Sequence, residues 1–124
     1  NIINKDTFSS VLNKSLITEI SIDNNRIHTI DNNVFLEFIN LKILILTNNN
    51  LTTIDNVIFP ESLEKLNLSA NTLTTIDNVK FPESLKLLYL STNNLTTIDN
   101  VKLPESLEGL ILYHNKKSCT RIKK

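Results

Sequence analysis

The sequence is poor in the residues that several kinds of functional site require. It contains one glycine and one cysteine among 124 residues, and no tryptophan or methionine. A phosphate-binding loop needs several glycines close together, so Gly109 alone does not make one. The single Cys119 cannot form a disulfide within the chain. No apolar run reaches the roughly eighteen residues of a membrane span, so we expect none.

Patterns typical of catalysis and metal binding are also absent from the sequence. Cys119 and His114 are close in sequence, but nothing orients them as a nucleophile and its base. His28 falls on a predicted turn. No set of His, Cys or carboxylate residues has the spacing of a zinc site. The sequence therefore predicts a protein that is not an enzyme, with no catalytic residues, no metal and no cofactor.

The charges are distributed unevenly along the chain. Residues 1–115 contain eight Lys and Arg against 13 Asp and Glu, a net charge of −5. The last nine residues hold five basic side chains, Lys116, Lys117, Arg121, Lys123 and Lys124. Such a segment can contact nucleic acid or an anionic surface. An acidic body is a poor surface for DNA, so we expect no nucleic-acid partner.

One thirteen-residue stretch occurs three times. LTTIDNVKFPESL occupies residues 73–85, and near-copies occupy residues 51–63 and 95–107. A longer pattern, L-x-x-L-x-L-x-x-N-x-L, starts at residues 17, 41, 63, 85 and 107. The starts are 24, 22, 22 and 22 residues apart, and only the last copy ends in Lys117 rather than an apolar residue. A fixed period of this size indicates a repeat architecture.

The L-x-L part of each copy has the alternation of a strand with one buried face. It predicts inward side chains at Leu66 and Leu68 and at the matching positions Leu88, Leu90, Leu110 and Leu112. No single repeat can bury this face alone, so neighbouring repeats must stack into a parallel sheet.

All but the first of the segments that return from one strand to the next contain F-P-E-S or L-P-E-S. Because proline lacks a backbone N–H, we expect extended or 3₁₀ structure there rather than a regular helix. Leu73, Ile76, Val79 and Phe81 are predicted to face the core. Only the first return segment, with NNVFLEFIN, is expected to hold a helical turn or two.

Residues 1–16 lie outside the repeat. Phe8, Val11, Leu12 and Leu16 follow Asp6-Thr7 at helical spacing, which predicts a short helix that caps the first repeat.

The five copies, residues 17–115, resemble leucine-rich-repeat proteins. The resemblance implies an α/β-type repeat solenoid, a horseshoe segment with a parallel β-sheet on its concave face and mostly extended or 3₁₀ segments on its convex side. It also implies that the recurring asparagine forms a structural ladder of hydrogen bonds to the backbone of adjacent turns. The ladder residues are Asn25, Asn49, Asn71, Asn93 and Asn115.

Finer resemblances concern subfamily and location. The stretch NRIHTIDNNVFLEFINLKILIL is similar to the 24-residue type common in extracellular members, and P-E-S-L is similar to bacterial effector repeats. An extracellular or cell-surface location is favoured over a cytoplasmic one. NKKSC resembles the opening of a cysteine-rich C-terminal cap, but Lys116 replaces its proline and Arg121 its second cysteine. Residues 116–124 are therefore either a basic tail or the start of a cap.

The copies differ mainly at outward positions of the predicted strands, while the return segments vary at two columns only. One scaffold is thus repeated and the face it presents is varied. We expect partner-binding residues on the concave face at Ile45, Asn67, Leu87, Tyr89, Ile111, Tyr113 and His114. Leu87, Tyr89, Ile111 and Tyr113 should cluster toward the C-terminal end of this face, and exposed apolar clusters mark binding surfaces. Alternatively, a cap or further repeats cover this cluster.

The favoured function is that of a recognition module that binds another protein through the concave sheet. Two alternatives stay open. In the first, the chain is a structural component that self-associates, since repeats with apolar ends favour open-ended contacts. In the second, it is the targeting domain of a larger protein.

Overall fold

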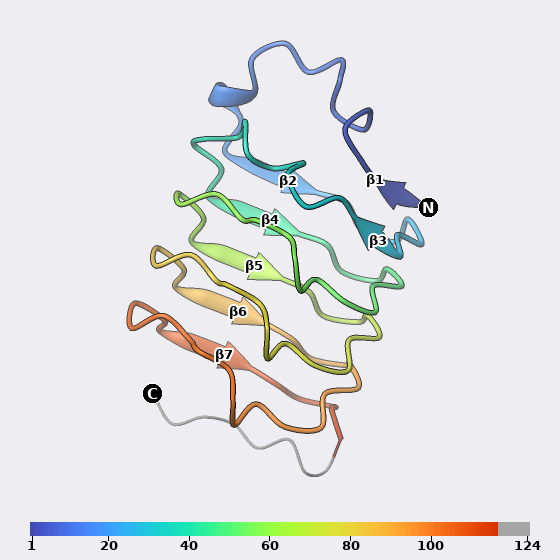
Figure 1. Ribbon diagram of the computed structural model, residues 1–124, viewed down its shortest axis with the longest axis vertical. Coiled ribbons are helices and arrows are strands. Elements are labelled where there is room, and N and C mark those ends of the chain that lie inside the picture. The colour runs from blue at the N-terminus through green and yellow to red at the C-terminus, as the bar shows by residue number, and fades with distance from the viewer. Residues whose placement is uncertain (117–124) are drawn as a thin grey trace.

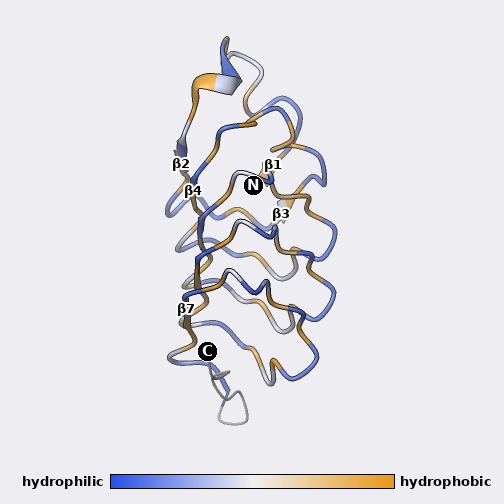
Figure 2. Ribbon diagram, turned by 90° about the vertical axis from the view of Figure 1, so that its left-hand side faces the viewer, coloured by the Kyte–Doolittle hydropathy of each residue, from blue (hydrophilic) through white to orange (hydrophobic). Residues whose placement is uncertain are grey.

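The computed structural model describes residues 1–116, and the rest of the predicted basic tail, with Cys119, lies outside the described residues. The chain winds into a solenoid in which successive turns lie side by side along the long axis (Figure 1). One edge of each turn is a short strand, and the opposite edge is an irregular return segment (Figure 2).

The strands of the repeats form one parallel five-stranded sheet in the order β2-β4-β5-β6-β7. Its strands are three residues each: β2 Glu19–Ser21, β4 Ile43–Ile45, β5 Lys65–Asn67, β6 Leu87–Tyr89 and β7 Gly109–Ile111. Each strand pairs with the next in the same register, so residues at one repeat position form straight columns. The predicted parallel sheet is confirmed.

A second, two-stranded sheet joins the N-terminus to the first repeat. In it, β1 Ile2–Ile3 pairs in parallel with β3 Thr29–Ile30. The side chain of Ile3 is buried, so this pairing extends the core to the start of the chain.

The core fills the space between the sheet and the return segments. Leu66, Leu68, Leu88 and Leu90 are fully buried, as the alternation within each L-x-L predicts. The predicted core residues of the third return segment are also buried, Leu73, Ile76, Val79 and Phe81. Burial of one such side chain contributes about 1.5–3 kcal/mol. Because neighbouring turns cover these side chains, every turn depends on its neighbours for this stabilisation.

The return segments contain turns and no helix. In the third, the N–H of Val79 donates to the carbonyl of Ile76 at 3.2 Å, and that of Leu85 to Pro82 at 3.1 Å. The first return segment is also built from separate turns, in contrast to the expected helical turns. Phe35 and Phe38, which anchor it, are fully buried. Their burial fixes its path without consecutive helical hydrogen bonds.

The prediction of a helix after Asp6 is wrong. The segment forms turns, and the one helix among residues 1–116 is η1, the 3₁₀ turn Lys14–Leu16. Phe8 packs edge-on against Phe38, with ring centroids 5.1 Å apart. Leu12 and Leu16, however, are 93% and 73% exposed. The predicted helical face would cover four apolar residues, whereas the structure partly buries Phe8 and Val11 and leaves Leu12 and Leu16 exposed.

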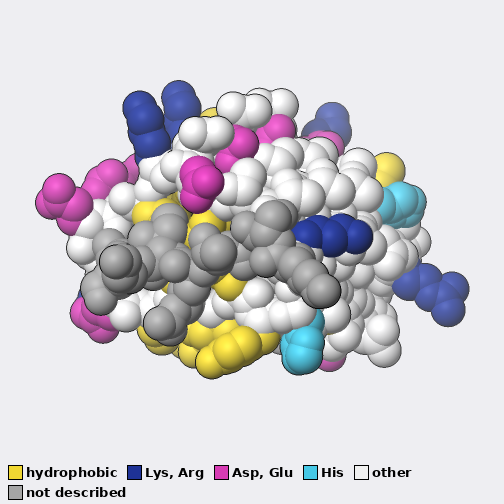
Figure 3. Space-filling model, turned by 90° about the horizontal axis from the view of Figure 1, so that it is seen from below, with side chains coloured by type: hydrophobic (Ala, Val, Ile, Leu, Met, Phe, Trp, Pro, Cys, Tyr) yellow, Lys and Arg dark blue, Asp and Glu magenta, His cyan; other side chains and the backbone are white. Residues whose placement is uncertain are grey.

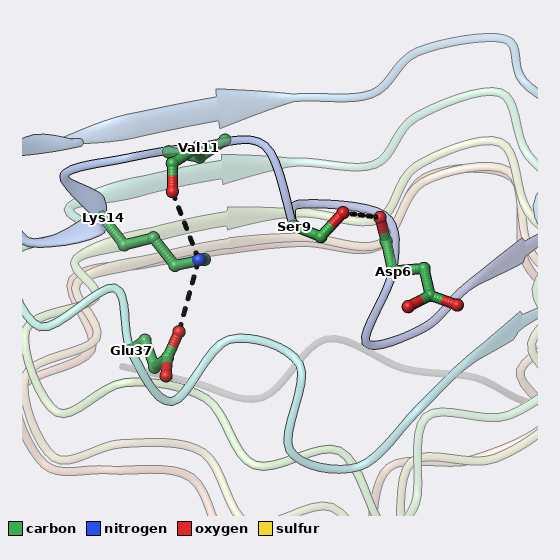
Figure 4. A network of polar contacts seen from close by, with 5 residues as sticks. All are labelled: Asp6, Ser9, Val11, Lys14 and Glu37. Carbon is green, nitrogen blue, oxygen red and sulfur yellow. Dashed lines mark hydrogen bonds and ion pairs between the residues drawn. The ribbon is translucent and has the colours of Figure 1, made fainter.

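Polar contacts hold the N-terminal segment over the first repeat (Figure 4). Lys14 Nζ donates to the carbonyl of Val11 at 3.3 Å and lies 3.4 Å from Glu37. The hydroxyl of Ser9 donates to the carbonyl of Asp6 at 3.0 Å, which closes a turn. These local bonds replace those that a helix would make.

The predicted asparagine ladder forms at four of its five positions. In its centre, Asn71 Nδ2 donates to the carbonyls of Leu46 and Leu68 at 3.0 Å, and its Oδ1 accepts the N–H of Leu51 at 3.0 Å. Asn93 repeats this pattern one turn later. The equivalent bonds of Asn49 and Asn115 each join their own turn to the preceding turn in the same way. Each amide therefore joins two turns.

Asn25 is the exception, and its prediction as a ladder residue is wrong. Its side chain is exposed and Nδ2 donates to the carbonyl of Asp23 at 2.8 Å. The ladder amide reaches back to the preceding turn, and the first repeat has no such turn. Instead, Asn1 reaches forward, and its Nδ2 donates to the carbonyl of Asn25 at 2.7 Å.

A second ladder, which the sequence analysis missed, lies at the opposite corner of the solenoid. The serine of each P-E-S-L donates its hydroxyl to a carbonyl one turn back: Ser62 to Leu41 at 2.7 Å, and Ser84 to Leu63 at 2.6 Å. Ser106 donates likewise to Leu85. Both ends of β5, β6 and β7 are thus tied to the preceding turn by a side chain.

The turn after each strand requires a left-handed backbone. Positive φ angles of 56–63° recur in one column, at Asn24, Asn48, Ala70, Thr92 and His114. Asparagine tolerates this region, whereas a β-branched residue such as Thr92 is strained there. The strain is offset by the ladder bonds of the adjacent asparagines.

Replacement of Asn71 by alanine should lower the free energy of unfolding by about 2–4 kcal/mol, because buried backbone groups on two turns lose their partner. Asn25→Ala should cost less than about 0.5 kcal/mol, since Asn25 is exposed and outside the ladder. Urea unfolding followed by circular dichroism compares the two variants. Equal losses would show that the ladder does not stabilise the stack.

Candidate functional site

The outward side chains of the five-stranded sheet form the candidate site, called here the sheet face. Its columns follow from the register of the strands. The first column is Glu19, Ile43, Lys65, Leu87 and Gly109; the second is Ser21, Ile45, Asn67, Tyr89 and Ile111. Asp23, Thr47 and Tyr113 continue three of the strands on the same side, two residues further along. These are the outward columns that the repeat pattern predicts.

The C-terminal part of the sheet face is apolar. Leu87, Tyr89 and Ile111 are half-buried, and Tyr113 is 70% exposed. A Cβ on Gly109 would lie 2.9 Å from Leu87 Cδ2, so the absent side chain of Gly109 leaves the space into which Leu87 leans. Viewed from the C-terminal end, apolar side chains gather along one edge of the molecule (Figure 3).

The one lysine on the sheet face is directed toward this apolar part. Lys65 Nζ lies 5.4 Å from the centroid of the Tyr89 ring. The aromatic quadrupole attracts the ammonium group, an interaction of about 0.5–1 kcal/mol at an exposed site. The contact fixes the orientation of both side chains, and it turns the positive charge away from β2.

The N-terminal part of the sheet face is acidic. Glu19 and Asp23 are exposed on β2 and just beyond it. Asp23 Oδ1 accepts the hydroxyl of Thr47 at 2.6 Å and Nδ2 of Asn48 at 3.0 Å. These two bonds, Thr47 first, lower the pKa of Asp23 below its ordinary value. Among residues 1–116, neither carboxylate forms an ion pair.

Four of the predicted binding residues, Leu87, Tyr89, Ile111 and Tyr113, make up the apolar part described above, and the other three lie elsewhere. Ile45 and Asn67 lie half-buried in the middle of the sheet face, and the Oδ1 of Asn67 accepts the N–H of Ser69 at 3.1 Å. His114 lies exposed in the turn that follows β7. The prediction left out Glu19, Asp23 and Lys65, although their outward columns already placed them on the same face.

The N-terminal end of the solenoid has a different character. β2 is the edge strand of the sheet, and among residues 1–116 no strand pairs with its outer side. Leu12, Leu16 and Ile39 are largely exposed near this edge. Asn40, next to Ile39, donates to the carbonyl of Ser15 at 2.7 Å, which places the two segments together. Figure 2 shows the 3₁₀ turn projecting beyond the sheet at this end.

A groove of about 680 Å³ lies between the N-terminal segment and the first return segment. It is lined by apolar Phe8, Val34 and Leu36 and by the charged Lys5 and Glu37, among others. Within the described part of the chain, no group of three or more His, Cys, Asp or Glu is arranged to hold a metal. The same residues include no helix of the length and apolar character that crosses a membrane.

Comparison with known proteins supports the assignment of the repeats. The family model described as leucine rich repeat matches residues 15–60. The match covers the first repeat and most of the second, and the columns of the sheet extend the same arrangement to β7. No curated protein matches the sequence.

The hydrogen bonds to Asp23 predict a pH dependence. Because its pKa is lower in the folded chain than its ordinary 3.8, its ionised form contributes stability above that value, and the contribution is lost as pH falls through the folded pKa. NMR titration should show the pKa of Asp23 rising toward its ordinary value in Thr47→Val. Ser69→Ala, elsewhere on the sheet, serves as the control. An unchanged titration in Thr47→Val would contradict the assignment.

Proposed function

Because the chain is a leucine-rich-repeat protein, we propose that it recognises another protein through its sheet face. Leucine-rich repeats generally serve as interaction folds rather than as enzymes. The observation that carries the proposal is the contrast between constant and variable positions. The core and the two ladders are nearly identical from turn to turn, while the outward columns change in size, charge and polarity.

The sheet face suits recognition because it is preorganised. Its backbone is fixed by strand pairing on both sides of β4, β5 and β6, and the Lys65–Tyr89 contact limits two of its longest side chains. A surface ordered before binding loses little conformational entropy when the partner arrives. Tyr89 and Tyr113 also belong to the residue type that most often anchors protein interfaces.

The apolar part of the sheet face should carry most of the binding energy. A bait with Tyr89, Ile111 and Tyr113 all changed to serine is expected to hold its partner at least about tenfold more weakly than the wild type. Capture from the native source, with quantitative comparison of the two baits, measures the difference. The matched control is Ile58→Ser, which removes an exposed apolar side chain from a return segment.

Both altered baits must retain the wild-type circular dichroism spectrum and a cooperative unfolding transition. Equal capture by the wild type and the triple variant would exclude this patch as the binding surface. Loss of capture by the Ile58→Ser control would instead place the surface on the return segments.

A second candidate function, assembly with copies of the same chain, is favoured by the N-terminal end. Its unpaired strand edge offers backbone hydrogen bonds, and Leu12 and Leu16 offer apolar area beside it. Under this function, the wild type should grow in mass with concentration in sedimentation experiments, and Leu12→Ser/Leu16→Ser should remain monomeric. A wild type that stays monomeric throughout would exclude assembly through this end.

A further inference from the structure

We propose that the segment bound by the sheet face carries a basic residue at one end and apolar residues at the other, and that it lies across the strands. This inference rests on the proposed function, since it specifies the partner of the same surface. It is carried by the different character of the two ends of the face and by the orientation of Lys65 between them.

The acidic end has the charge and accessibility to receive a cation. Glu19 and Asp23 are exposed and lie on the same side of one strand. Thr47 and Asn48 hold Asp23 in place through its Oδ1 atom. Within residues 1–116 the second carboxylate oxygen accepts no hydrogen bond, so it is available to a partner. Lys65, the cation nearest in the outward columns, is engaged by Tyr89 on the far side. An arginine or lysine from a partner would therefore meet two uncompensated carboxylates.

The apolar end lies several strands away. Leu87 and Tyr89 are on β6 and Ile111 is on β7, whereas Glu19 is on β2. At about 4.8 Å between strands, the separation from β2 is roughly 14 Å to β6 and 19 Å to β7. An extended chain advances about 3.3 Å per residue. The basic residue of the partner should thus precede or follow the apolar residues by about four to six positions.

The middle of the face restricts what can lie between these ends. Ile43 and Ile45 on β4 and Asn67 on β5 are half-buried, so they present a shallow surface rather than a deep pocket. Small or polar residues fit above it. A segment with the opposite charge would place an acidic side chain against Glu19 and Asp23, which like-charge repulsion disfavours.

The test uses a displayed library of random twelve-residue peptides selected on the wild-type chain, residues 1–124. Peptides that also bind the Tyr89→Ser/Ile111→Ser variant are discarded. We expect the enriched sequences to share Arg or Lys four to six positions from one or two large apolar residues. A synthetic peptide of the enriched sequence should bind Glu19→Gln/Asp23→Asn about tenfold more weakly, and its binding should weaken as salt is raised.

The matched control is Glu61→Gln/Glu83→Gln, which removes the same charge from exposed positions of the return segments. Its affinity for the peptide should equal that of the wild type. If peptides depend on Tyr89 and Ile111 but lack the basic residue, or bind the two carboxylate variants equally, this inference is wrong and the proposed function stands. If no enriched peptide depends on Tyr89 and Ile111, both the inference and the proposed function are overturned.

Discussion

The asparagine amide that follows each strand from β4 to β7 is the interaction on which the stack depends. It donates to carbonyls of its own turn and of the turn before, and it accepts an N–H from that earlier turn. These groups are buried, so an unbonded turn would leave them without water or partner at a cost of about 1–3 kcal/mol each. Because the hydrogen bonds of the amide form only at one separation of the two turns, the amide fixes both the spacing and the register of neighbouring turns. The serines of P-E-S-L apply the same constraint at the other corner.

Once register is fixed at the corners and in the core, most outward side chains of the strands are not needed to hold the turns together. Lys65, Leu87 and Gly109 occupy one column in successive strands without disturbing the pairing. Their only mutual adjustment is local, as Leu87 leans into the space that Gly109 leaves. Substitutions on this face should therefore change its size, charge and polarity at little cost in stability. The same separation explains why nearly identical return segments accompany unlike strands in one chain.

The sequence predicts the strands and the core because these depend on period and residue type alone, and the resemblance to leucine-rich repeats supplies most of the ladder. It misleads at the N-terminus, since the spacing of Phe8, Leu12 and Leu16 fits a helix, whereas the first repeat partly buries Phe8 and leaves Leu12 and Leu16 exposed. It also misleads at Asn25, where the pattern persists but the preceding turn is missing. The Lys65–Tyr89 and Asp23–Thr47 contacts join residues more than twenty positions apart. Their side-chain directions depend on neighbours one turn away, which a repeat pattern does not specify.

The geometry of the sheet favours recognition across the strands over recognition along a strand. Each strand is three residues long and presents only two of them outward, so little can be read along a strand. Across the strands the face offers five successive positions per column at a constant spacing of about 4.8 Å. An extended partner advances about 3.3 Å per residue. Three of its residues therefore span about the same distance as two strand spacings, so roughly every third residue of the partner would lie above every second strand. Under the proposed function, a rigid stack selects a partner by the spacing of a few side chains. The carboxylates at β2 and the apolar group at β6 and β7 are then the positions expected to discriminate best, because they lie farthest apart on the face.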